Sequence, residues 1–106
     1  MRHLRKEFSV ELHGRAKTSN KTSENAFTMI ILCTKYGDVL EFSPHDIDSD
    51  VANYIAKNYM SILRLTDILA KTLFEMRVKE LKLTLDEGSV LITKDKNIVK
   101  IKIALT

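Results

Sequence analysis

The sequence predicts a small α+β domain in which an antiparallel five-stranded sheet packs against one long amphipathic helix. Strand-like apolar runs occur in two groups, and the segment between the groups has a helical apolar period without Gly or Pro. The expected order of elements is therefore β-β-α-β-β-β, preceded by an N-terminal segment. With 106 residues, the chain has room for a single domain.

The first two strands form a hairpin around a glycine turn. Residues 28–36 (TMIILCTKY) contain the strongest strand signal, and the unbroken apolar run inside this segment indicates a central strand that is covered on both faces. Gly37 and Asp38 then supply a turn, and residues 39–42 begin the second strand.

The last 28 residues of the chain predict a three-strand meander. Apolar and polar residues alternate in residues 81–85 and again in residues 99–105, and residues 90–92 form a short apolar run between them. Polar turns at residues 86–89 and 94–97 separate these strands.

The segment between the two groups predicts an amphipathic helix from residue 47 to about residue 77. With a step of about 100° per residue, one narrow stripe contains six apolar side chains and the opposite side is polar. The stripe comprises Val51, Ile55, Ile62, Leu69, Leu73 and Met76. Such a helix would be longer than a typical strand, so it must kink, break or overhang the sheet. Further apolar residues widen the arc to roughly 200°, and the surplus must contact the N-terminal segment or a second subunit.

An acidic cluster precedes this helix. Asp46, Asp48 and Asp50 alternate as at the start of a calcium-binding loop. The rest of the loop does not fit, because Val51 occupies the position that requires Gly and Lys57 the position of the bidentate Glu. We therefore interpret residues 43–46 as a capping box with Pro at the first helical position, and the aspartates as complements of the helix dipole.

The N-terminal segment, residues 1–26, is basic and is separate in composition from the core domain, residues 27–106. Its first 13 residues fit a helix by their spacing of 3 and 4 and a strand by their alternation; we favour the helix without excluding the strand. A polar loop follows. The segment holds six basic and three acidic residues, whereas the other 80 residues hold 11 of each. The basic residues are Arg2, Arg5, Lys6, Arg15, Lys17 and Lys21.

No catalytic, metal-binding or cofactor-binding pattern stands out. The three glycines are isolated, the three histidines lie in different segments, and Cys33 lies inside an apolar run, as a core residue would. We therefore expect no enzyme activity, no cofactor and no metal. The longest apolar run, residues 29–33, is far shorter than the ~20 residues of a membrane span, and a lone thiol suits the cytoplasm.

The order of these elements resembles the roadblock (dynein light chain) domain family. The resemblance covers residues 29–106 and rests on the glycine turn in MIILCTKYGDVLEFS, the long helix and the meander KELKLTLDEGSVLITKDKNIVKIKIAL. The loop at residues 14–26 is longer than in the family, and no terminal helix follows the last strand. Other helix-on-sheet folds, such as the profilin-like and longin-like folds, remain open and also imply binding.

This resemblance implies a non-catalytic, dimerising scaffold or adaptor that binds or regulates a small Ras-like GTPase. The wide apolar arc independently favours a homodimer, because a monomer would expose a large apolar patch. We expect the subunit contact to include Tyr54, Met60, Leu63, Ile68 and Phe74. The alternative function is nucleic-acid binding through the six basic N-terminal residues, although their interspersed acidic residues and single aromatic disfavour it.

Overall fold

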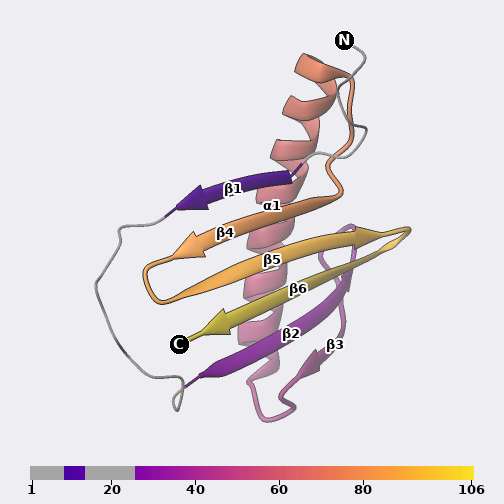
Figure 1. Cartoon of the computed structure of the whole chain (residues 1–106). Coiled ribbons are helices and arrows are strands. Elements are labelled where there is room, and N and C mark those ends of the chain that lie inside the picture. The colour runs from indigo at the N-terminus through magenta and orange to yellow at the C-terminus, as the bar shows by residue number, and fades with distance from the viewer. Residues whose placement is uncertain (1–8, 14–25) are drawn as a thin grey trace.

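A six-stranded sheet and one helix form two layers in the computed structural model, which describes residues 9–13 and 26–106 (Figure 1). The order of strands in the sheet is β1-β4-β5-β6-β2-β3. The strands are β1 (Ser9–His13), β2 (Phe27–Thr34), β3 (Val39–Ser43), β4 (Glu80–Leu85), β5 (Gly88–Asp95) and β6 (Ile98–Leu105). Five of them, β2 to β6, pair antiparallel as expected, and β1 adds to the β4 edge in parallel.

All five strands expected in residues 27–106 are confirmed. β2 pairs with β6 along its whole length and with β3 on its other edge, where a bulge between Leu32 and Cys33 leaves Leu40 without an opposite residue. The expectation that β2 is covered on both faces is met only in part, because Ile30 and Leu32 remain half-buried on the side away from the helix.

The preference for a helix in the leading segment is wrong for the residues described, because residues 9–13 form strand β1. β1 pairs with β4 from Ser9 opposite Glu80 to His13 opposite Thr84. An unpaired β4 edge would present a row of N–H and C=O groups to solvent, and pairing with β1 satisfies them. The N-terminal segment therefore contributes to the same sheet as the rest of the chain.

The helix α1 spans Ser49–Phe74, so it starts and ends two to three residues inside the predicted limits. Its N-cap is Asp48, whose Oδ1 accepts a hydrogen bond from the Asp50 N–H at 2.9 Å. The predicted capping box at residues 43–46 is therefore wrong. Residue 43 ends β3, and the Ile47 N–H donates to the Pro44 carbonyl in a turn before the helix. At the other end, Glu75 adopts a left-handed conformation that terminates the helix.

The predicted excess length of α1 appears as an overhang. Figure 1 shows that α1 runs across the strands rather than along them, and that its last turns project past β1. With 26 residues, α1 is about 39 Å long at ~1.5 Å per residue. Six strands about 4.8 Å apart span only about 24 Å. The width of the sheet, not the length of its strands, is the dimension that the helix exceeds.

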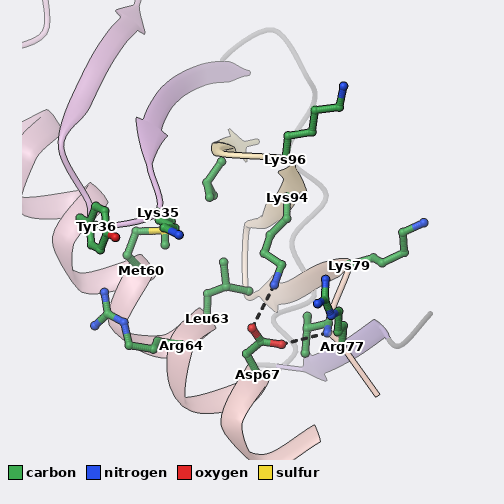
Figure 2. Close-up of a pocket in the computed structure, with 12 residues that line it drawn as sticks. Lys35, Tyr36, Met60, Leu63, Arg64, Asp67, Arg77, Lys79, Lys94 and Lys96 are labelled. Carbon is green, nitrogen blue, oxygen red and sulfur yellow. Dashed lines mark hydrogen bonds and ion pairs between the residues drawn. The ribbon is translucent and has the colours of Figure 1, made fainter. Parts of the chain in front are cut away.

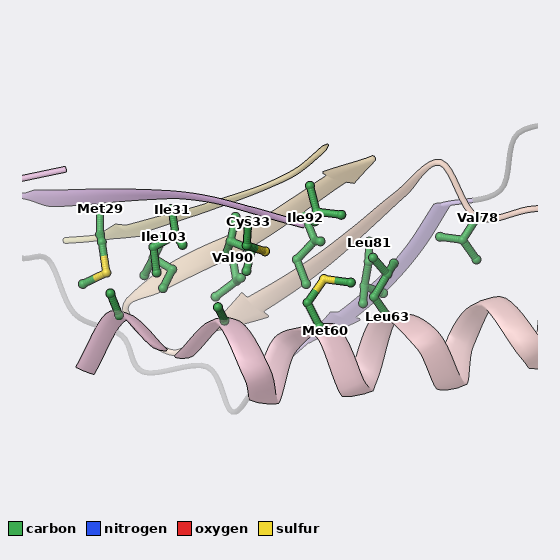
Figure 3. Close-up of a cluster of buried hydrophobic side chains, with 14 of the residues drawn as sticks. Met29, Ile31, Cys33, Met60, Leu63, Val78, Leu81, Val90, Ile92 and Ile103 are labelled. Carbon is green, nitrogen blue, oxygen red and sulfur yellow. The ribbon is translucent and has the colours of Figure 1, made fainter. Parts of the chain in front are cut away.

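The core lies between α1 and one face of the sheet (Figure 3). Alternate residues of β2, β4, β5 and β6 point toward the helix, including the fully buried Ile31, Ile92 and Ile101. Cys33 is buried among them, as expected, and this burial raises the pKa of its thiol, with a further contribution from Asp38. The helix contributes mainly small side chains; its buried residues are Ala52, Ala56, Met60, Leu63 and Ala70.

This arrangement differs from the one that the apolar stripe suggested. The residues of that stripe that lie on α1 point mostly into solvent, and Val51, Leu69 and Leu73 are all exposed. The alanine side of the helix faces the sheet instead, because short side chains let the helix approach the strands closely. The largest apolar side chains of α1 are therefore left on the outside.

The core makes a direct prediction about stability. Ile101→Ala should lower the free energy of unfolding by about 2–5 kcal/mol, because it leaves a cavity at a fully buried site. Ile98→Ala is the matched control on the same strand, and its side chain is 38% exposed, so less than about half of that loss is expected. Denaturant unfolding of both variants measures the difference; equal losses would contradict this description of the core.

Candidate functional site

Six large apolar side chains are exposed on one side of α1, which we call the outer face of α1. They are Val51, Tyr54, Ile62, Leu65, Leu69 and Leu73. Their exposed fractions range from 40% at Ile62 to 72% at Tyr54. Contiguous apolar surface of this kind is characteristic of interaction sites, whereas single exposed apolar residues are ordinary.

The outer face of α1 also contains no charged residue. The helix has five ionisable side chains of the Asp, Glu, Lys and Arg types, and a step of about 100° per residue places all of them in one band on the other side. These five are Asp50, Lys57, Arg64, Asp67 and Lys71. The polar residues between the apolar ones are small or uncharged, such as Asn58, Ser61 and Thr72. The centres of protein interfaces are depleted of charge in the same way.

The five residues expected at a subunit contact separate into two groups. Tyr54, Ile68 and Phe74 are exposed, with Phe74 at the last position of the helix. Met60 and Leu63 are 4% and 2% exposed, because they belong to the core between α1 and the sheet. Met60 and Leu63 are therefore unavailable to a partner in this structure. The outer face adds accessible residues that the expectation omitted, namely Val51, Ile62, Leu65, Leu69 and Leu73.

A second feature is a groove of about 440 Å³ on the opposite flank of α1 (Figure 2). Three connections between elements meet α1 there: the β2–β3 turn, the α1–β4 connection and the β5–β6 turn. Its cations are Lys35, Arg64, Arg77, Lys79, Lys94 and Lys96. A smaller adjoining hollow of about 280 Å³ shares Arg64, Asp67, Arg77 and Lys94 with the groove and adds Lys71.

Local turn geometry presents Lys35 and Tyr36 at this groove. The Thr34 hydroxyl accepts hydrogen bonds from the Tyr36 and Asp38 N–H groups, each at 3.2 Å, which closes the β2–β3 turn. Gly37 has φ +89°, a conformation that favours glycine, and its N–H donates to the Thr34 carbonyl at 2.9 Å. The Lys35 ammonium lies 5.4 Å from the centre of the Tyr36 ring, within the range of a cation–π contact.

Among residues 9–13 and 26–106, Asp67 is the only acidic residue that lines the groove. Its Oδ1 accepts a hydrogen bond from the Val78 N–H at 3.1 Å, and its Oδ2 is 3.0 Å from the Lys94 Nζ (Figure 2). Partial burial alone would raise the pKa of Asp67. The Val78 and Lys94 hydrogen bonds, with the charges of Lys94 and Arg77, outweigh that effect and hold the pKa below its ordinary value. The ionised Asp67 side chain therefore links α1 to Val78, which precedes β4, and to Lys94 of β5.

Sequence reasoning did not identify the groove. The cations of the groove come from four separate parts of the chain, and residues 27–106 have a net charge of zero. No local sequence pattern therefore predicts the groove. The only local signal was the position of Lys35 and Lys96 in the two turns at the same end of neighbouring strands.

The six basic N-terminal residues lie outside the described residues, so the nucleic-acid hypothesis stays a prediction. Within residues 9–13 and 26–106, no cluster of three or more His, Cys, Asp or Glu could hold a metal ion. Among the same residues, no helix is both long and apolar enough to cross a membrane.

A long helix across one face of an antiparallel five-stranded sheet defines a two-layer α+β domain, and solved structures identify the particular fold. The chain matches a roadblock/LC7 domain from Streptomyces avermitilis with a TM-score of 0.65, 16% identity and 73% of this chain covered. It matches Myxococcus xanthus MglB with a TM-score of 0.61, 18% identity and 71% covered. A gliding protein MglB from Thermus thermophilus gives a TM-score of 0.60, 16% identity and 73% covered. The protein therefore has the roadblock-type fold, which confirms the resemblance at the level of structure.

These matches cover 64%, 61% and 58% of the three solved chains, respectively, so this chain spans about three fifths of their length. No protein-family model matches the sequence. No curated protein is significantly similar to it either.

The electrostatics of Asp67 make a prediction about pH. A folded-state pKa below the ordinary value of 3.8 means that the carboxylate stabilises the fold above that value, and that this contribution is lost as the pH falls through the folded pKa. Asp67→Asn keeps an oxygen that can accept from the Val78 N–H but removes the charge. It should lower the free energy of unfolding at neutral pH by at most about 1 kcal/mol, because the ion pair is partly exposed.

Urea unfolding at neutral pH and near pH ~2 tests this, since the difference from the native protein should vanish in acid. Asp86→Asn, in the exposed β4–β5 turn, is the control and should show no such difference. A loss of stability that is equal at both pH values would contradict the assignment.

Proposed function

We propose that this protein is a non-catalytic scaffold of the roadblock type that forms a homodimer through the outer face of α1. The observation that carries the proposal is the absence of charge from a helix face on which six large apolar side chains are exposed. Covering this face removes apolar surface from water and desolvates no charged side chain of the helix, so association is favourable at about 25 cal/mol per Å² before its entropic cost.

The spacing of the apolar residues supports a second copy of the chain as the occupant. On the outer face, Val51 and Leu73 each lie 11 residues from Ile62, and the counterpart of Leu69 is Ile55, which is half-buried against the core. In a two-fold symmetric dimer, each residue i that contacts residue j of the partner is matched by the reverse contact. An antiparallel pair of α1 helices centred on Ile62 would therefore place residue 51 opposite residue 73 and residue 55 opposite residue 69.

On the flanks of this stripe, an antiparallel pairing about Ile62 sets Leu65 opposite Tyr59 and Asn58 opposite Thr66, and each pair joins residues of similar polarity. Tyr54 would lie opposite Ala70, which is buried against the sheet, so this tyrosine has no exposed counterpart. One of the matched solved structures is described as MglB with a tetrameric arrangement, which supports self-association as a property of proteins with this fold.

The second part of the proposal is that the dimer binds or regulates a small Ras-like GTPase in the cytoplasm. Its support is the resemblance to the roadblock family, now joined by the roadblock-type fold. Fold alone does not determine function, so dimerisation and GTPase binding are tested separately.

The dimer is tested first at its centre. Ile62→Glu should convert the dimer to a monomer, because two carboxylates would meet across the two-fold axis in an apolar contact. Glu has a higher helix propensity than Ile and the side chain is 40% exposed, so the fold should be retained. Light scattering at micromolar concentration measures the mass, and circular dichroism checks the fold.

Asn53→Glu is the matched control, since it adds the same charge at an exposed position on the charged side of α1, and it should remain dimeric. A native protein that is already monomeric would overturn the proposal, as would an Ile62→Glu variant that dimerises normally.

The antiparallel arrangement is tested by a charge exchange. Val51→Lys and Leu73→Glu should each weaken dimerisation by about tenfold or more, which corresponds to about 1.4 kcal/mol. The double variant should associate more tightly than the sum of the two losses predicts, because each Lys would face a Glu of the partner. The two positions are ~33 Å apart along one helix, so they cannot pair within a chain.

Sedimentation equilibrium of the four proteins gives the coupling energy. A parallel pairing would set like charges opposite each other already in the single variants, so the double variant would show no favourable coupling, and that result would contradict the antiparallel arrangement.

GTPase binding is tested with the tagged protein in a native pull-down, read by mass spectrometry with excess GTP or GDP present. We expect a small Ras-like GTPase to be enriched by the native protein and lost with Ile62→Glu. A variant that lacks residues 1–8 keeps β1 and shows whether the first basic residues contribute. Failure to recover any small GTPase while the protein remains dimeric would overturn this part alone.

A further inference from the structure

We propose that the basic groove beside α1 binds a small phosphorylated molecule with a flat apolar body, that is, a ligand of the nucleotide class. The groove combines clustered cations, an apolar floor and an aromatic wall within about 440 Å³. This volume lies within the ~300–1,000 Å³ that is typical of small-molecule sites.

The first argument is the segregation of charge. Residues 27–106 contain 11 basic and 11 acidic side chains, and six of the basic ones line the groove beside a single acidic one. An even distribution would give the groove similar numbers of both. Cations held close together repel one another, and a multivalent anion between them relieves that repulsion.

The second argument is that the one acidic residue is already neutralised. Asp67 is paired with Lys94 and accepts the Val78 N–H, so it contributes little negative potential to the rest of the groove. Arg64 and Lys96 make no ion pair with any acidic residue in the described part of the chain. Arg64 and Arg77 approach from α1 and from the connection to β4, and guanidinium groups bind phosphate oxygens in pairs of parallel hydrogen bonds.

The third argument concerns the uncharged surface. Met60, Leu63, Val78 and Val99 form a floor of buried side chains, and the Tyr36 ring, 69% exposed, stands at the edge. The floor side chains are at most 4% exposed, so the exposed Tyr36 ring is where an apolar group of a ligand can pack, and inorganic phosphate alone would leave this ring uncovered. A planar base can stack on the tyrosine while its phosphates contact the cations.

The shape favours a small molecule over a strand of nucleic acid. The cations lie on several elements at one end of the sheet: Figure 2 shows Lys94 and Arg77 beside Asp67, and Arg64 further along α1 with its side chain directed away from Asp67. The groove also lies on the opposite side of α1 from its outer face, so it stays open whether or not that face is covered by a second copy. The proposal is therefore independent of dimerisation.

Isothermal titration calorimetry of the full chain with ATP, inorganic triphosphate and adenosine tests the proposal. ATP should bind saturably, with affinity that falls as NaCl rises from about 0.05 to about 0.5 M. Triphosphate should bind more weakly than ATP, and adenosine more weakly still. Arg64→Ala and Arg77→Ala should each weaken ATP binding by about tenfold. Tyr36→Ala should weaken ATP binding while leaving triphosphate binding unchanged.

The control is Lys82→Ala with Lys102→Ala, two exposed lysines that flank Leu91 on the sheet face away from α1, and it should bind ATP normally. The proposal is overturned by absence of saturable binding, by equal weakening in this control, or by binding of a single-stranded oligonucleotide without binding of ATP. The monomeric Ile62→Glu variant should bind ATP like the native protein, so failure of the dimer and failure of this site give distinct results.

Discussion

The close approach of α1 to the sheet is the constraint on which the rest of the structure depends. Ala52, Ala56 and Ala70 face the strands, and Met60 and Leu63 are the larger side chains of α1 that are fully inserted into the core, with Ile55 and Tyr59 packed against it in part. Side chains as short as alanine let the helix lie close to β2 and β3, but they bury little area of their own. The bulky aliphatic residues of α1 must then lie elsewhere, and most of them lie on the outer face. A helix whose only role is to cover its own sheet would instead bury its bulky aliphatic residues and expose its small ones.

This constraint also determines where the charges of the helix can lie. One side is occupied by the sheet and another by apolar residues, so all five charged side chains are confined to the remaining band. That band borders the turns at one end of the sheet, which bring Lys35, Lys94 and Lys96 toward Arg64. The groove and the outer face are therefore consequences of the same helix orientation, placed on opposite flanks.

The sequence predicted the elements well and their orientation poorly. Period and turn chemistry were enough for α1 and for strands β2 to β6, because each of these signals is local. Which apolar arc faces the sheet is not a local property: Val51, Ile62 and Leu69 have the stronger hydrophobicity, yet the alanines give the closer packing. For the leading segment the helix was favoured over the strand for a similar reason, since the strand conformation of β1 depends on pairing with β4, about 70 residues away in the chain. The clustering of cations likewise depends on tertiary structure and left no local pattern.

The symmetry of the apolar stripe about Ile62 bears on whether this surface contacts a second copy of the chain or a different apolar partner. An apolar face that serves only a different partner has no reason to repeat its spacing in reverse, because the partner can supply any pattern. A face that contacts its own copy in an antiparallel arrangement must match its own reversal, and the equal distances of Val51 and Leu73 from Ile62 meet that requirement along the centre of the face. The absence of charge on the same face removes the usual means of rejecting a second copy.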